Sequence, residues 1–196
     1  QLGNSARKDS AFSKNYSGLF PSGYLSYQAD SSNTFTFTAG RRIDRPPFQK
    51  LNPFVVLINK YTFSRGNPFL LPQGSWNMEL SHQFKQLLTT TVSYSITKDY
   101  FSQIFLAEAS DILVYTDGNV GKMYNFGISM AAQATPFKWW SFSGQVIYNH
   151  KELKGYQNLN YTSNVSQLNF SMNNQLRISP VYTAEVSGFY TTKARN

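Results

Sequence analysis

Polar and apolar side chains alternate with a period of two residues along most of this chain. Phe35 and Phe37 alternate with threonines, and Leu168, Phe170 and Met172 alternate with Gln, Asn and Ser. This pattern predicts β-strands that have one apolar and one polar face. Turn-forming residues separate the alternating segments. We therefore predict an all-β chain folded as an antiparallel up-and-down meander of about eight strands.

The connections between the predicted strands alternate strictly between short and long. The short turns are expected at Asp30–Asn33, Lys85–Gln86, Thr135–Lys138 and Ile178–Val181, and the long excursions at Ala39–Gln73, Ala107–Gly121 and His150–Asn160. In an antiparallel meander, successive connections lie at opposite ends of the sheet, so all the long ones share one end. This sorting is typical of outer-membrane barrels, which have short periplasmic turns and long external loops. A soluble β-sandwich would explain the two faces but not the sorting.

The long excursions carry two further expectations. Asp117-Gly118 suits a type I′ turn, so we place a hairpin tip there. The segment Asp44–Gln73 is too long for a plain connection and too apolar for disorder. We expect it to be ordered and packed on itself. The apolar side chains expected to be buried in it are Phe48, Leu51, Phe54, Phe63, Phe69 and Leu71.

Two sequence blocks in the stretch Ala39–Gln73 point to a known family. The first block comprises Arg41, Arg42, Arg45, Pro46, Phe48, Leu51, Asn52, Pro53 and Phe54, and the second comprises Gly66, Asn67, Pro68, Leu70 and Pro72. With Leu19-Phe20-Pro21-Ser22 ahead of them, they resemble the β-barrel portion of TonB-dependent outer-membrane receptors of Bacteroidetes type. The resemblance extends over roughly Leu19 to Tyr190.

The resemblance implies a segment of a barrel of about 22 strands, the plugged transporter class. Residues 1–17 would then be a polar N-terminal segment and residues 18–196 a partial barrel domain, with the plug domain and the final strands absent. It also implies location in the outer membrane of a Gram-negative cell, with lipid as a neighbour. TonB, the plug domain and an unidentified nutrient would be partners of the full-length parent. The chain would supply wall and external loops but would not transport alone.

The arginines Arg41, Arg42 and Arg45 have two interpretations. They could contact an anionic ligand, or lipopolysaccharide phosphates, through bidentate guanidinium bonds. They could instead hold the long loop by capping its carbonyls and pairing with Asp44, which the R-P and N-P turns favour.

Other functional classes find little support in the sequence. The chain lacks cysteine, and its two histidines, His82 and His150, have no carboxylate at ligand spacing, so we expect no metal site and no cofactor. The net charge of +8 comes from scattered residues without a nucleic-acid-binding motif. No catalytic constellation is present, so we do not expect an enzyme. The alternative function is a soluble or surface-attached all-β binding module without transport activity.

The apolar face of such a segment needs a cover, because a large apolar patch does not stay in water. We expect one of two outcomes. Either the sheet curls with its apolar face inward, or copies of the chain associate through edges and apolar faces.

Overall fold

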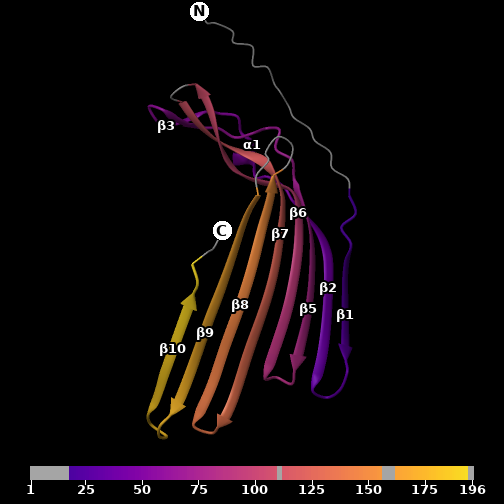
Figure 1. The fold of residues 1–196 in the computed structure, drawn as a ribbon, viewed down its shortest axis with the longest axis vertical. Coiled ribbons are helices and arrows are strands. Elements are labelled where there is room, and N and C mark those ends of the chain that lie inside the picture. The colour runs from indigo at the N-terminus through magenta and orange to yellow at the C-terminus, as the bar shows by residue number, and fades with distance from the viewer. Residues whose placement is uncertain (1–17, 110–111, 156–161, 194–196) are drawn as a thin grey trace, which may run out of the picture.

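The computed structural model describes residues 18–109, 112–155 and 162–193, and it shows one curved sheet with a small hairpin attached at one end (Figure 1). Eight strands form the meander: β1 (Ser22–Gln28), β2 (Asn33–Asp44), β5 (Gln73–Phe84), β6 (Leu88–Ala109), β7 (Ile112–Phe137), β8 (Trp140–Gly155), β9 (Thr162–Arg177) and β10 (Thr183–Thr191). No helix in these ranges is long and apolar enough to cross a membrane.

The strand order confirms the predicted meander. The strands lie in the order β1-β2-β5-β6-β7-β8-β9-β10, and every neighbouring pair is antiparallel. Each strand therefore pairs with the strands nearest to it in the meander, as short hairpin turns require. A Greek-key order, which would have supported a sandwich, does not occur among the described strands.

The turn between β1 and β2 shows how local chemistry sets a hairpin. The Asp30 carboxylate accepts hydrogen bonds from the backbone N–H groups of Ser32 (2.6 Å) and Asn33 (2.8 Å) and from the Asn33 side-chain amide. The Asn33 side chain, followed by the Ser32 N–H, lowers the pKa of Asp30, because these donors stabilise the charged form. Lys85, with φ of 51°, reverses the chain between β5 and β6.

The register keeps one face apolar across the whole sheet. Directly opposed residues share a face, and one such row runs Leu25, Phe37, Leu80, Val92, Ile128, Tyr148, Leu168. The neighbouring row, one residue along, runs Ser26, Thr36, Ser81, Thr91, Ser129, Ile147, Asn169. A single slipped register would have mixed the two faces.

The apolar face of the sheet is exposed. Phe35, Phe37 and Phe170 are 38%, 42% and 38% exposed, and the buried apolar side chains of the described residues are Leu70, Val114 and Val120. The expectation that the sheet curls with its apolar face inward is therefore wrong. The sheet has almost no core of its own, because its apolar side chains face the surroundings and do not pack against one another.

Two of the predicted loops are strand extensions instead. β6 and β7 continue far beyond their neighbours as a two-stranded ribbon, the β6–β7 extension, and their connection falls at residues 110–111, outside the described part (Figure 1). The prediction of a turn at Asp117-Gly118 is wrong, since these residues pair with Gln103 and Ser102 in mid-strand. Likewise, residues 150–155 belong to β8, and the rest of that predicted loop, 156–160, lies outside the described residues.

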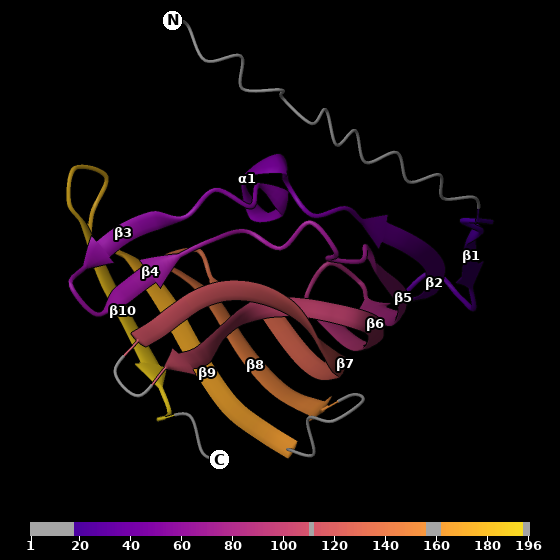
Figure 2. The same cartoon turned by 90° about the horizontal axis from the view of Figure 1, so that it is seen from above.

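The long segment between β2 and β5 contains secondary structure of its own. It includes the single-turn helix α1 (Phe48–Leu51) and the hairpin of β3 (Val56–Asn59) and β4 (Thr62–Ser64). β4 pairs in parallel with β7, from Thr62 opposite Leu113 to Ser64 opposite Tyr115. Seen from above, the strands trace an arc and this segment lies across its open side (Figure 2).

Gly121 is the residue of β7 at which pairing with β8 ends, whereas β4 pairs further out, at Leu113–Tyr115. Its φ is +146°, and a Cβ there would lie 2.0 Å from the Lys154 carbonyl oxygen. The close approach lets β8 end against β7 at the pair Gly121–Gly155 while β7 continues outward. Only glycine fits this conformation and this spacing.

We predict that Gly121→Ala destabilises the sheet by roughly 1–3 kcal/mol, because an L side chain is strained at this φ and overlaps the Lys154 carbonyl. Chemical denaturation of the protein in detergent micelles measures the change. Gly23→Ala is the matched control, since a Cβ there meets nothing within 4 Å. Equal stabilities of the two variants would contradict the assignment.

Candidate functional site

The two motif blocks of the long segment lie together at the outer end of the sheet, the end that carries this segment and the β6–β7 extension. The Gly66 N–H donates to the Asn52 carbonyl (2.9 Å), and the Asn67 N–H donates to the Lys50 carbonyl (2.6 Å). A Cβ on Gly66 would lie 2.4 Å from the Asn52 carbonyl oxygen. Gly66 is therefore required by the close approach of two backbones.

Each block contains the same local turn. In Asn52-Pro53-Phe54, the Asn52 Oδ1 accepts the Phe54 N–H (3.2 Å), and in Asn67-Pro68-Phe69 the Asn67 Oδ1 accepts the Phe69 N–H (2.9 Å). Both are Asx turns, in which the asparagine side chain replaces a backbone acceptor. The proline in the middle of each triplet has a fixed φ angle, so each N-P-F triplet is restricted in advance to a turn conformation.

The segment is anchored to the β6–β7 extension by polar contacts. The Lys50 Nζ lies 2.7 Å from the Asp117 carboxylate, at a pair that is partly buried, and 5.2 Å from the centre of the Phe101 ring. The Asn67 side-chain amide donates to the Asp117 carbonyl (3.0 Å). The helix α1 and the second motif block therefore converge on one residue of β7.

Asn119 is the second anchor. Its side chain accepts the Leu71 N–H (2.9 Å) and donates to the carbonyls of Leu71 (3.0 Å) and Asp99 (2.7 Å). Leu70, between the Asn67 and Leu71 contacts, is 1% exposed. Asp117 and Asn119 thus attach the long segment to β7 beyond the end of β8. We call this set of contacts the loop anchor.

The predicted burial of the loop phenylalanines is wrong. Phe48, Phe54 and Phe69 are 75%, 78% and 71% exposed and Leu71 is 46% exposed, whereas Leu51 and Phe63 are half-buried. The segment is ordered because hydrogen bonds and one ion pair hold it against β7. The prolines and asparagines of the motif blocks serve the turns, and most of the aromatic side chains face outward.

The structure separates the three arginines predicted to bind a ligand. Arg41 lies opposite Trp76 on the apolar face, and Arg42 lies opposite Ser75 on the polar face. Arg41 and Arg45 line one hollow, which Arg42 does not border. The Asp44 carboxylate accepts a hydrogen bond from the Gln73 side chain (2.9 Å), and none of the three arginines pairs with it.

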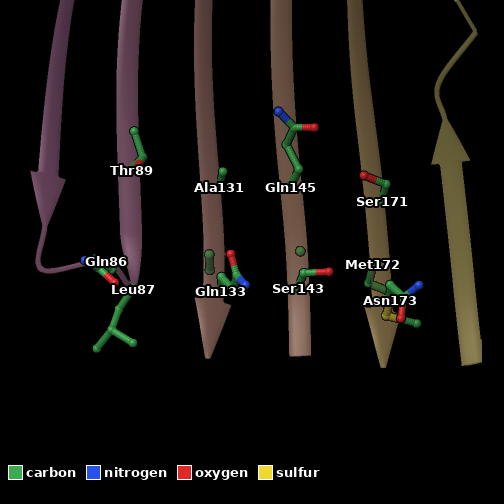
Figure 3. A pocket seen from close by; sticks show the side chains of 12 residues that line it. Gln86, Leu87, Thr89, Ala131, Gln133, Ser143, Gln145, Ser171, Met172 and Asn173 are labelled. Atoms are coloured by element: carbon green, nitrogen blue, oxygen red, sulfur yellow. The ribbon is translucent and has the colours of Figure 1, made fainter. Parts of the chain in front are cut away.

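A second hollow lies on the polar face near the short turns and encloses about 440 Å³. Its side chains come from β6, β7, β8 and β9 and from the β5–β6 turn (Figure 3). Gln133, Gln145 and Asn173 contribute amides, Ser143 and Ser171 contribute hydroxyls, and none of the lining residues is charged. The hollow offers neutral hydrogen-bonding groups and no catalytic constellation. Among the described residues, no group of three or more His, Asp or Glu side chains could hold a metal ion.

The described geometry is that of a barrel wall, with one outward apolar face, one polar face and elaborations at one end. The model of the outer membrane protein beta-barrel family matches the chain over residues 1–196. The chain belongs to this family. It is therefore an outer-membrane β-barrel chain, and its apolar face is the face that meets lipid. A comparison with curated protein sequences finds no match.

Solved structures of siderophore receptors share the fold. The siderophore receptor PirA of Pseudomonas aeruginosa aligns with a TM-score of 0.58 at 12% identity, over 89% of this chain and 42% of PirA. The ferric enterobactin receptor PfeA of the same organism aligns with a TM-score of 0.54 at 13% identity, over 86% of this chain and 34% of PfeA. This outer-membrane chain thus spans less than half the length of either receptor.

We predict that Asn119→Ala releases the long segment, with a loss of roughly 2–4 kcal/mol for three hydrogen bonds of about 1 kcal/mol each. Limited proteolysis of the folded protein should show faster cleavage within residues 45–72. The control is Asn77→Ala, which removes a single side-chain hydrogen bond, to Ser75, on exposed β5. Unchanged cleavage in Asn119→Ala would show that the loop anchor does not hold the segment.

Proposed function

We propose that this chain forms part of the wall and external loops of a TonB-dependent receptor that imports a scarce nutrient across the outer membrane. In this proposal residues 18–196 are a partial barrel domain, residues 1–17 are a polar N-terminal segment, and other parts of the parent protein supply the plug domain and the remaining strands. The chain itself performs no catalysis.

The observation that carries the proposal is the pairing of a two-faced wall with an ordered outer segment. The wall continues one apolar face through eight strands, and the loop anchor fixes the long segment across the open side of the arc (Figure 2). An anchored external loop is able to hold exposed aromatic side chains in place above a lumen. Phe48, Phe54 and Phe69 are then candidates to contact an incoming solute, because their rings are exposed on an ordered backbone.

The likeness to siderophore receptors supports the same class of function. It makes iron chelates the first ligands to test. The polar hollow supports the proposal too, because neutral amides and hydroxyls on the lumen side suit contact with a plug domain. The alternative of a soluble binding module conflicts with the wide exposure of the apolar face and with membership of an outer-membrane family.

We predict that Phe170→Arg impairs folding into a membrane by roughly 2–4 kcal/mol, the cost of a cation at the middle of a lipid-facing strand. Phe170 lies near the middle of β9 on the apolar face. Asn169→Arg, one residue away on the polar face, is the control and should cost much less. Refolding into lipid vesicles at increasing urea measures the difference, and equal costs would argue against a lipid-facing role.

We predict that the parent protein takes up a ligand only when TonB is intact. Uptake of a panel of labelled ferric siderophores is measured in cells that express the parent, with and without a functional TonB system. The same panel is tested on a variant in which glycine and serine replace residues 53–64, which should lower uptake of the accepted ligand. Uptake that persists without TonB would indicate a passive pore.

A further inference from the structure

A hollow on the outer face of the sheet collects the basic residues near the loop end of β2, β5 and β6. It encloses about 650 Å³, and Arg41, Arg45 and Lys98 contribute three cations against the one carboxylate of Asp99. Phe20 and Trp76 provide aromatic walls. We call this hollow the outer basic site. It lies on the other side of the sheet from the polar hollow of Figure 3.

The register places the outer basic site on the lipid-facing side. Arg41 is opposite Trp76, and Trp76 is opposite Ile96, so all three belong to the apolar face. Lys98 lies opposite Gly74 in the same row as Ile43. A solute in the lumen meets the other face, where Arg42 lies. The ligand of this site must therefore arrive from the lipid phase.

The height of the site along the strands matches the border of the lipid hydrocarbon. From Asn33 at the short turn to Arg41 is nine residues inclusive, and a tilted barrel strand needs about 9–11 residues to cross the hydrocarbon layer. Phe35, Phe37 and Ala39 precede Arg41 on the same face, so an apolar stretch ends where the cations begin. Lipid headgroups occupy this level, and aromatic side chains gather there.

The arginine is oriented for an anion. One guanidinium nitrogen of Arg41 donates to the Leu19 carbonyl (3.3 Å), and the guanidinium carbon lies 5.9 Å from the centre of the Phe20 ring. A guanidinium has five N–H donors, so the contact with Leu19 uses one of them and leaves others for a ligand in the hollow that Arg41 lines. Planar, charge-assisted pairing with phosphate is the interaction that arginine makes best.

We infer that the outer basic site binds the phosphate group of an outer-leaflet glycolipid. The phosphate lies among Arg41, Arg45 and Lys98, and the sugar or acyl portion contacts Phe20 and Trp76. This inference concerns the lipid-facing side and does not depend on the nutrient import proposed above. Failure of one leaves the other intact, because lipid retention and ligand uptake are separate measurements.

The test uses the parent protein, purified and placed in nanodiscs that contain phosphorylated lipid A or its dephosphorylated form. Native mass spectrometry measures the lipid that stays bound. The test variant is Arg41→Gln/Arg45→Gln/Lys98→Gln, and Arg42→Gln on the opposite face is the matched control. Lys98→Gln alone is included as a milder variant, in case the triple substitution prevents folding. Inorganic phosphate is added as a competitor in a separate arm.

We expect wild-type protein and Arg42→Gln to retain phosphorylated lipid A and to release the dephosphorylated form. Retention should fall roughly tenfold in the triple variant, since several charge-assisted hydrogen bonds are lost, and by a smaller factor in Lys98→Gln. Three results would overturn the inference. The first is lipid retention in the triple variant equal to that of wild type or, where the triple variant does not fold, the same result in Lys98→Gln. The second is equal retention of both forms of lipid A by wild type, and the third is displacement of lipid by inorganic phosphate alone, which would assign the site to a free anion.

Discussion

The register that the strands of the meander share is the constraint on which the rest of this structure depends, and between β6 and β7 it stays continuous from Leu88 to Thr97 before it shifts at Tyr100. Each inner strand of the meander pairs with a neighbour on both sides, whereas β1 and β10 pair on one side. A lipid-facing strand must satisfy its backbone hydrogen bonds in this way because hydrocarbon offers no partner. Since opposed residues share a face, the alternation in one strand must keep step with the alternation in the next. Phe37, Leu80 and Val92 show this, as do Thr36, Ser81 and Thr91 one residue away. Stability therefore comes from the ladder and the surrounding lipid, and a packed core is not needed.

Backbone hydrogen-bonding groups of such a sheet lose their partners where the pairing between two strands stops. β8 ends at Gly155, whereas β7 continues outward to Ile112, so one edge of β7 is left without its neighbour. β4 pairs with part of that edge, and Asp117 and Asn119 bind the motif blocks over the rest. Uncovered strand edges invite pairing with other chains. The long segment therefore closes an edge at the outer end of the wall, in addition to any contact it makes with a ligand.

The period of the sequence predicted the meander because a local signal repeats in every strand. The same period also separates Arg41 from Arg42, since successive side chains of a strand point to opposite faces. The turn prediction at Asp117-Gly118 failed because the local turn preference of this dipeptide is weaker than strand pairing. Gly118 is buried in β7, where an added Cβ would lie 2.7 Å from Ile104 Cδ1. The loop anchor could not be predicted from the sequence. Lys50 and Asp117 are 67 residues apart, and no local pattern joins them.

Composition misled in the long segment for a related reason. Six apolar side chains suggested a small core. The segment is instead held by two Asx turns and by backbone hydrogen bonds between the two motif blocks, which are distant in the sequence. Leu71 links this arrangement to the lipid side. Its N–H and carbonyl both bond to Asn119, and the same residue lines the outer basic site together with Arg41 and Lys98. The backbone that holds the loop over the lumen is thus also a wall of the hollow that faces lipid. Order in the external loop and the shape of the outer basic site depend on one short stretch of chain.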